Sequence, residues 1–195
     1  MGDTTGNAAG DAVGGEIADR YERLSDGLAA KLAQVPPTGW DLPTPCDGWT
    51  VRDLVGHLVD TQGMFLGFVG RTLGEIPAVA DDPVAAFAGA RAVVLADLRD
   101  PERAGAEFDG FFGRTTFAAG VDRFLSFDLV VHAWDLARAA ALDERIDPED
   151  VARVQAAAEA FGDAMRGPQA FGPALEAPAG ADAQARLLAF LGRRP

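Results

Sequence analysis

The sequence contains almost no cysteine or lysine, and both shortages limit what the protein can be. Cys46 is the only cysteine among 195 residues, so neither an intrachain disulfide nor a cysteine-based zinc finger can form. A chain without disulfides is expected in the cytoplasm. Lys31 is the only lysine, and 17 basic residues stand against 30 acidic ones, for a net charge of −13. Such a charge disfavours nucleic acid and anionic membranes as partners.

Long apolar runs and common nucleotide-binding motifs are also missing. Hydrophobic residues make up 48% of the chain, yet no stretch approaches the roughly 18 consecutive apolar residues of a membrane-spanning helix. The sequence contains neither a glycine-rich phosphate loop after a predicted strand nor a G-x-S-x-G nucleophile motif. Residues 1–15 lack both a basic start and an apolar run, so we expect a disordered tail there and no signal peptide.

The rest of the chain shows the periodicity of amphipathic helices. Apolar residues recur three and four positions apart, whereas strand-like alternation never persists. Thr50, followed three residues later by Asp53, matches the capping box that begins a helix. The pattern predicts helices over 16–34, 51–69, 84–98, 116–141, 148–165 and 183–192.

These helices predict an all-α fold. The four long helices before residue 142 are typical of a four-helix bundle, in which ligand sites lie between facing helices. The connection over 70–82 is long enough to cross the bundle, so simple up-and-down order is not required. We therefore expect one domain over 16–195, with 143–195 as a helical C-terminal extension of short additional helices.

The only two histidines both fall on predicted helices. His57 lies on the second helix, and His132 lies on the fourth, four residues after Asp128. Residues four apart on a helix point from the same face, one turn apart. Asp128, His132 and His57 would therefore make a three-donor metal set. Such a set leaves coordination positions open for water or substrate, as catalytic metal sites do.

An ordinary explanation of the same residues stays open. Asp128 and His132 could form a simple pair within one helix, with His57 elsewhere. Asp128, however, lies among apolar residues, and a buried carboxylate needs a cation or hydrogen bonds to offset its lost hydration. Both histidines also lie on core-like helix faces in a chain that is poor in histidine, which favours the metal site.

Nearby residues offer alternatives to this set. Asp60, three residues after His57, could be a fourth ligand or hold a water molecule. Asp135, three after His132, is more simply explained by a salt bridge to Arg138. Cys46 is expected to be a small buried residue, without a histidine left to activate it. Aromatic residues are expected in the core: Trp134, Phe108, Phe111 and Phe112.

Two separated motifs resemble one known family. Residues 40–60 include Pro-Cys-Asp-Gly-Trp-Thr-Val-Arg-Asp-Leu-Val-Gly-His, and residues 127–139 read Phe-Asp-Leu-Val-Val-His-Ala-Trp-Asp-Leu-Ala-Arg-Ala. They are similar to the DinB/YfiT-like metalloprotein superfamily, and closest to its actinobacterial branch with the metal-binding domain of mycothiol-dependent maleylpyruvate isomerase. The resemblance covers roughly residues 21–141, and residues 187–195 also resemble a short subfamily of this group.

The resemblance implies a four-helix bundle that holds a divalent metal, commonly zinc, on three side chains. It places those ligands at His57, Asp128 and His132. One departure is Asp128, because the isomerase has glutamate at that position. A second departure is the C-terminus, which is too short for the additional isomerase domain that contributes a catalytic arginine. Maleylpyruvate isomerase activity is therefore not carried over to this chain.

Two functional classes follow from the sequence. The first is a metalloenzyme, a transferase or isomerase that brings a low-molecular-weight thiol such as mycothiol to an electrophilic substrate. The second is a non-catalytic metal- or ligand-binding bundle, for example a sensor or stress protein. Zinc is the expected cofactor, with nickel or another divalent metal as alternatives. The expected partners are small molecules, and a homodimer is left open.

Overall fold

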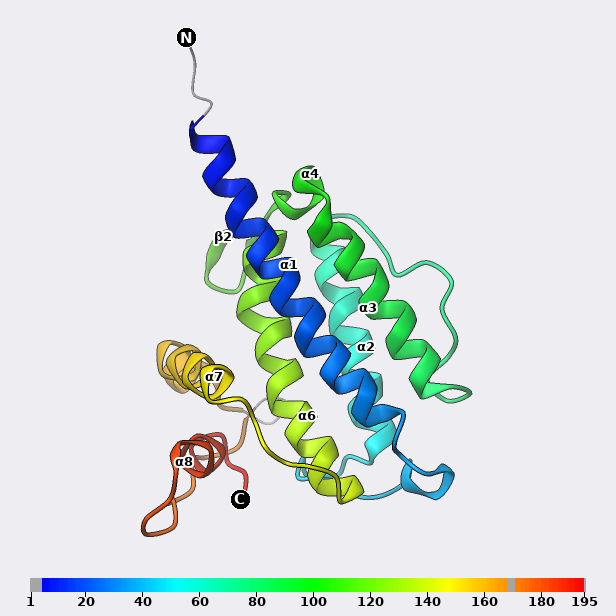
Figure 1. The fold of residues 1–195 in the computed structure, drawn as a ribbon, viewed down its shortest axis with the longest axis vertical. Coiled ribbons are helices and arrows are strands. Elements are labelled where there is room, and N and C mark those ends of the chain that lie inside the picture. The colour runs from blue at the N-terminus through cyan, green and yellow to red at the C-terminus, as the bar shows by residue number, and fades with distance from the viewer. Residues whose placement is uncertain (1–4, 168–170, 195) are drawn as a thin grey trace.

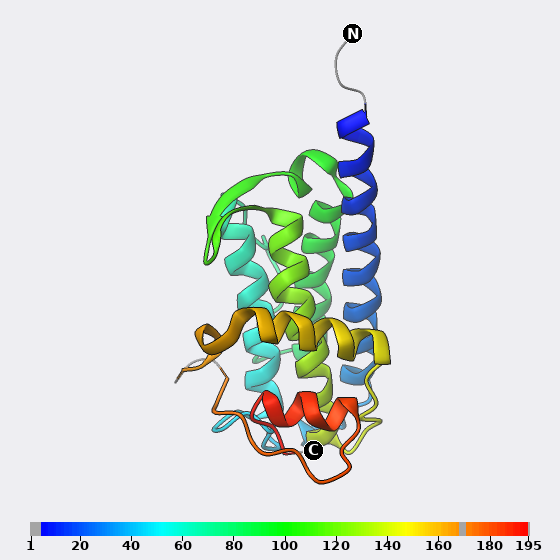
Figure 2. The same ribbon diagram turned by 90° about the vertical axis from the view of Figure 1, so that its left-hand side faces the viewer.

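Four long helices form the body of the protein in the computed structural model, which describes residues 5–167 and 171–194, with side chains from residue 14 onward. They are α1 (Thr5–Leu32), α2 (Val51–Phe68), α3 (Pro83–Arg99) and α6 (Ser126–Ala140) (Figure 1). Two further helices, α7 (Pro148–Phe161) and α8 (Ala183–Phe190), cross one side of this bundle (Figure 2). The predicted all-α bundle with additional C-terminal helices is confirmed.

The bundle does not alternate up and down. Helices α1 and α6 run in one direction, and α2 and α3 run in the other (Figure 1). The connection over 70–82 therefore returns along the bundle before α3 begins, which is the crossover that its length allowed. Arg71, in this connection, pairs with Asp97 near the end of α3 (Nη1 to Oδ2, 3.1 Å), and this buried carboxylate helps to hold the two segments together.

Helix starts follow the caps in the sequence. The backbone N–H of Asp53 donates to the Thr50 hydroxyl (3.2 Å), and the Thr50 N–H donates to the Asp53 carboxylate (2.9 Å). This confirms the capping box at the start of α2. Aspartate side chains likewise accept from the first turns of α3, α7 and α8. The first helix is longer than predicted: residues 5–15 belong to α1, where we expected a disordered tail. Residues 1–4 lie outside the described part.

A short β-hairpin is present where the sequence predicted only a loop. Strand β1 (Glu107–Gly110) pairs antiparallel with β2 (Gly113–Thr116). Gly113 takes a positive φ of 99°, which glycine adopts without strain. Four-residue strands are too short to show a convincing alternation of apolar and polar residues. The turn residues Phe111 and Phe112 are 65% and 50% exposed, so their prediction as core residues was wrong.

The predicted helix over 116–141 is continuous, but it contains a π-helical segment between two α-helical ones. It begins as α5 (Phe117–Gly120), passes through the π-helical segment η2 (Val121–Leu125) and continues as α6. Three short helical turns complete the fold: α4 (Pro101–Ala104), η1 (Pro37–Gly39) and η3 (Gly162–Met165). Wide π-turns of this kind frequently occur near functional sites, and this one ends three residues before Asp128.

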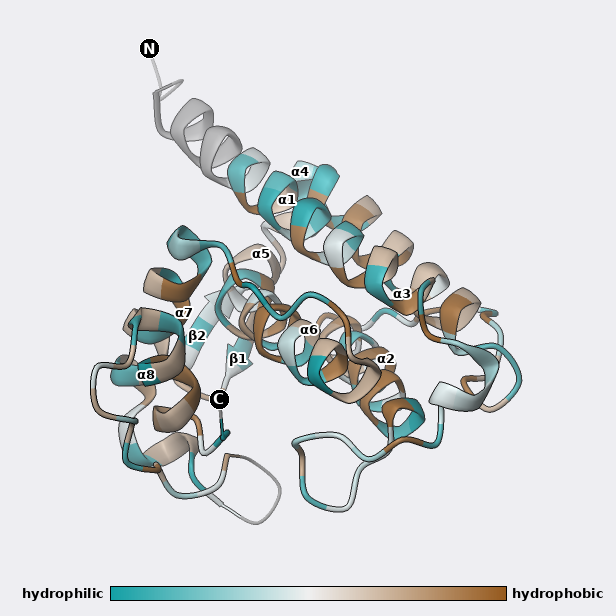
Figure 3. Cartoon of the chain, turned by 60° about the horizontal axis from the view of Figure 1, so that its bottom comes forward, coloured by the Kyte–Doolittle hydropathy of each residue, from teal (hydrophilic) through white to brown (hydrophobic). Residues whose placement is uncertain are grey.

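Apolar side chains from all four helices form one core cluster. Figure 3 shows the hydrophobic and hydrophilic residues alternating along these helices, as amphipathic helices require. Trp134 and Phe108 are buried, as predicted. A second core forms where α6 packs against α7 and α8, and it includes Phe127, Val130 and Leu187. Two opposite faces of α6 are therefore covered, one by the bundle and one by the C-terminal extension. No helix within the described ranges is long and apolar enough to cross a membrane.

Candidate metal centre

Helices α2 and α6 bring the two histidines together. The capping box fixes the start of α2, and this places His57 on its second turn, toward α6. The imidazole rings of His57 and His132 lie with their centroids 5.1 Å apart and nearly perpendicular, at 75°. Trp49 lies beside both rings, 4.9 Å from His57 and 6.1 Å from His132. The predicted convergence of the two helices at these residues is therefore present in the fold.

Asp128 completes a three-donor group. Its Oδ2 lies 3.4 Å from Nε2 of His57, so Asp128 contacts the opposite helix, whereas the ordinary explanation paired it with His132 on its own helix. One donor atom each from His57, Asp128 and His132 lie within 4.8 Å of one another. The side chain of His132 is 6% exposed, but His57 and Asp128 are 29% and 22% exposed. The group is thus anchored inside the bundle and open to solvent on one side.

Asp135 lies behind His132, on the side away from this opening. Its carboxylate is completely buried, and its Oδ2 lies within hydrogen-bond distance of Nδ1 of His132 (3.0 Å). Arg193 donates to both of its oxygens, from Nη2 at 2.8 Å and from Nε at 3.2 Å. Burial raises the pKa of Asp135, but the contacts with His132 and Arg193 outweigh burial and hold it at about 2.

The predicted salt bridge between Asp135 and Arg138 was wrong. Arg138 turns outward and pairs with Glu144 (Nε to Oε2, 3.1 Å), while Asp135 points into the protein. Residues three apart on a helix are offset by about 60° around its axis. That offset is enough to place Asp135 inside and Arg138 at the surface. The true partner, Arg193, lies 58 residues further along the chain.

Cys46 contacts the same network and is half-buried, where the sequence predicted a buried residue. Its thiol lies 3.4 Å from Oδ2 of Asp135, and Nη2 of Arg193 lies 3.5 Å from its sulfur. Burial and the negative charge of Asp135 raise the pKa of Cys46 to about 12, so the thiol stays protonated at neutral pH. This environment is the reverse of the one that activates a nucleophilic cysteine, because reactive thiols have lowered pKa values.

Cys46, His132 and Asp135 form a second group whose donor atoms lie within 4.8 Å of one another. The guanidinium of Arg193 already contacts two of its three members. A metal ion there would meet a buried positive charge at close range, which is electrostatically unfavourable. The group of His57, Asp128 and His132 has no such cation among its described contacts, so it suits a metal better. Neither group includes Asp60, which is exposed.

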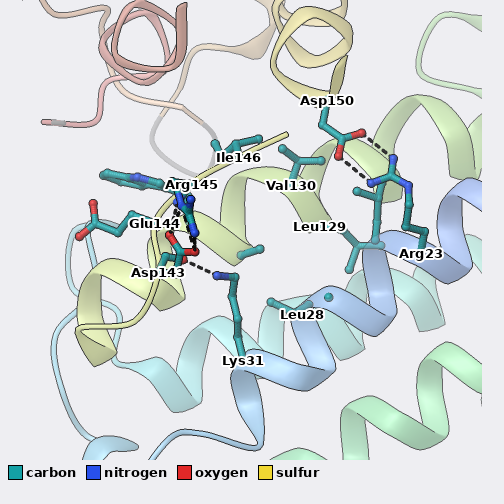
Figure 4. Close-up of a pocket in the computed structure, with 14 residues that line it drawn as sticks. Arg23, Leu28, Lys31, Leu129, Val130, Asp143, Glu144, Arg145, Ile146 and Asp150 are labelled. Atoms are coloured by element: carbon teal, nitrogen blue, oxygen red, sulfur yellow. Dashed lines mark hydrogen bonds and ion pairs between the residues drawn. The ribbon is translucent and has the colours of Figure 1, made fainter. Parts of the chain in front are cut away.

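A separate cavity of about 140 Å³ lies between α1, α6 and the segment that leads into α7 (Figure 4). Its charged groups are already paired. Arg23 makes two hydrogen bonds to Asp150, at 2.8 and 2.7 Å, and Arg145 binds Asp143 at 2.7 Å. Its lining includes neither histidine. The charged residues that line this cavity therefore already have partners within the protein. None of the three candidate metal ligands is among its lining residues.

The fold and the cluster define a class: a helical bundle with two histidines and a carboxylate converging between facing helices. The family model for the mycothiol maleylpyruvate isomerase N-terminal domain matches residues 21–137. The chain belongs to this mycothiol-related family of DinB-like bundles, whose members typically bind a metal. The matched region includes His57, Asp128, His132 and Asp135, whereas Arg193, α7 and α8 lie beyond it.

Two uncharacterised proteins of Mycobacterium tuberculosis, from strains CDC 1551 and H37Rv, are also similar to the chain. Each is 34% identical over 178 residues, which covers 89% of this chain and 95% of the relative. The similarity thus extends past the bundle into the C-terminal extension. No solved structure matches the chain significantly.

Proposed function

We propose that His57, Asp128 and His132 bind one divalent metal ion, with zinc as the first candidate and nickel or another divalent metal as alternatives. The observation that carries this proposal is the convergence of three donors from two helices within 4.8 Å. Zinc ligands at 2.0–2.2 Å lie roughly 3.4 Å apart in a tetrahedral site, which agrees with the 3.4 Å between His57 and Asp128. A plain ion pair between these two residues would leave the approach of His132 unexplained.

The chemistry of this donor set suits an open, reactive metal site. Two imidazoles and one carboxylate supply three ligands, and a catalytic zinc keeps its remaining positions for water or substrate. The partial exposure of His57 and Asp128 leaves one side accessible to a small molecule. A structural zinc site would be closed by a fourth protein ligand. The accessible side therefore supports a reacting or ligand-binding metal over a purely structural one.

We further propose that the protein is a cytoplasmic metalloenzyme, a transferase or isomerase that uses a low-molecular-weight thiol of the mycothiol type. A metal that binds the sulfur of such a thiol lowers its pKa and favours the nucleophilic thiolate. Cys46 is half-buried beside a carboxylate that keeps its thiol protonated, so it cannot readily supply that nucleophile itself. This favours a thiol from solution.

Apolar surface for an electrophile begins one helical turn from Asp128. Phe124, four residues before Asp128, lies with its ring centroid 5.7 Å from Phe111 and 6.1 Å from Phe112. The guanidinium of Arg123 lies 4.3 Å from the centroid of the Phe112 ring. A cavity of about 100 Å³ opens among these residues. Aromatic rings with an adjacent cation suit a small unsaturated molecule that carries a negative charge.

Addition of a low-molecular-weight thiol to the cobalt-loaded protein is expected to produce a thiolate-to-cobalt charge-transfer band. Cobalt is a spectroscopic substitute for zinc in sites of this kind, and the open side lets the thiol reach the metal. The band should saturate at one thiol per chain and persist in Cys46→Ser, which lacks the only protein thiol. It should be absent from His57→Ala. A band that disappears in Cys46→Ser would place the metal at the second group instead.

The second candidate function is a non-catalytic metal- or ligand-binding bundle. It predicts a cobalt spectrum that does not respond to thiols, and no thiol-dependent consumption of electrophiles by the zinc-loaded protein. A panel of electrophiles with and without the thiol therefore separates the two functions.

A further inference from the structure

The buried residues behind His132 form a chain of hydrogen bonds that the proposed metal site does not itself use. Nδ1 of His132 lies 3.0 Å from Oδ2 of Asp135, and Asp135 is held in turn by Arg193 at 2.8 and 3.2 Å. The side chains of Asp135 and Arg193 are 0% and 8% exposed. A pair of this depth costs free energy to desolvate and is weak evidence of a stabilising role. Its position behind a candidate ligand suggests a different purpose.

The carboxylate of Asp135 determines where His132 carries its proton. An ionised carboxylate only accepts hydrogen bonds, so the neutral imidazole must donate from Nδ1. The proton is then absent from Nε2, which keeps its lone pair for a metal. A carboxylate or carbonyl behind a metal-bound histidine commonly has this effect, and it also fixes the orientation of the ring.

Arg193 holds Asp135 in place and comes from the C-terminal extension. Its backbone N–H donates to the carbonyl of Leu188 (2.8 Å), and its Nη1 donates to the carbonyl of Leu191 (3.0 Å). The guanidinium also lies 4.7 Å from the ring centroid of Phe171. These contacts give the side chain one conformation, in which two N–H groups face the carboxylate of Asp135. The end of α8 is thus coupled to a histidine of the bundle.

We propose that Asp135 and Arg193 are positioning residues of the metal centre: Asp135 fixes the proton and the ring of His132, and Arg193, supplied by the C-terminal extension, fixes Asp135. This inference rests on the proposed metal site. It assigns a function to the C-terminal extension, which lies outside the region that defines the family.

Imidazole nitrogen NMR on the metal-free protein tests the first step directly. Because the chain has only two histidines, two sets of ring signals are expected, and those of His57 are identified by their loss in His57→Ala. His132 should be in the Nδ1–H form. An Nε2–H form in the unmodified, metal-free protein would overturn the proposal.

The double variant Asp135→Leu with Arg193→Met tests the consequence. Replacing a buried ion pair by apolar residues of similar size is often neutral for stability, so this variant leaves no unpaired charge behind. Asp128 is then the remaining carboxylate of the three-donor group, and the ring of His132 should lose its preference for the Nδ1–H form. Zinc affinity should fall at least about tenfold, as for other partners behind metal ligands. Arg194→Met, at the exposed neighbouring arginine, should match the unmodified protein.

The outcomes separate this inference from the metal site itself. If the unmodified protein binds zinc and the double variant binds it equally well, the positioning role is wrong and the metal site stands. If the unmodified protein binds no zinc, both proposals are wrong. Should the double variant not fold, the single variant Arg193→Met replaces it in the affinity measurement. Its affinity should also fall, and an unchanged value would overturn the role of Arg193.

Discussion

His132→Ala is expected to lose metal binding almost completely while the bundle stays folded. Structural zinc sites bind with about 10–16 kcal/mol shared by four ligands, or ~3 kcal/mol for each one. The loss of one ligand then weakens binding about 100-fold, because each 1.4 kcal/mol is a factor of ten. His132 is the most deeply buried of the three candidate ligands, and its replacement also removes the ring that Asp135 holds.

The fold should survive this change because the bundle has its own apolar core. Helices α1, α2, α3 and α6 contribute fully buried residues, among them Leu28, Leu54 and Leu136. After loss of the imidazole, Asp135 keeps its two hydrogen bonds from Arg193. We expect a loss in the free energy of unfolding of about 1–3 kcal/mol, as for a typical buried polar substitution.

Competition with a chromophoric chelator measures the zinc affinity, and circular dichroism reports the fold. The matched control is Asp60→Ala, which removes an exposed carboxylate one helical turn from His57. It should bind zinc like the unmodified protein. Equal affinity in His132→Ala would exclude this residue as a ligand. Complete unfolding would show that His132 serves the packing of the core.

Asp128→Asn is expected to weaken zinc binding about 100-fold. As for His132, each ligand contributes ~3 kcal/mol to the binding free energy. Asparagine keeps the shape of the side chain and removes its charge, so the variant isolates the electrostatic contribution. Asp128→Glu should keep or improve the affinity. Asp128 is 22% exposed and faces the open side of the group, so the additional methylene of glutamate has room.

The same chelator competition, performed on both variants in parallel, decides between the candidate carboxylates. If the zinc affinity is highest with Glu at this position, lower with Asp and lowest with Asn, Asp128 is supported as a ligand. If Asn binds zinc as tightly as Asp does, the carboxylate ligand lies elsewhere, and Asp135 of the second group is the next residue to vary.

Local signals in the sequence were sufficient to predict most of the helices. Thr50 with Asp53, and the aspartates before Pro83, Pro148 and Ala183, mark helix starts that the structure confirms. Capping depends on a few neighbouring residues and can be recognised without the rest of the fold. The start of α1 was missed, because residues 5–15 show little apolar periodicity.

The hairpin and the π-turn could not be predicted in this way. The strands of the hairpin have four residues each, and they are stabilised by contacts with distant residues, such as that of Phe108 with Phe65 and Phe68. The π-turn at Val121–Leu125 interrupts a sequence that is uniformly helical in character. For the hairpin, packing against distant residues determines the backbone, so local propensity gives little information.

The candidate site, like the fold, was predictable from the sequence only where local spacing carries the information. The four-residue spacing of Asp128 and His132 indicated a shared helix face, and the scarcity of histidine indicated His57 as their partner. The structure brings the three together, and metal binding itself stays a prediction. Arg193 could not be found from the sequence, because its partner Asp135 lies 58 residues away and nothing near either residue indicates the contact. A salt bridge within one helix was the only local explanation for Asp135.

Anomalous diffraction at the zinc absorption edge, from crystals of the zinc-loaded protein, tests the metal centre most directly. We predict a single strong peak between α2 and α6. It should lie about 2.0–2.2 Å from one nitrogen of His57, one nitrogen of His132 and a carboxylate oxygen of Asp128. A peak at Cys46 and Asp135, or no peak between the two histidines, would contradict the proposed metal site.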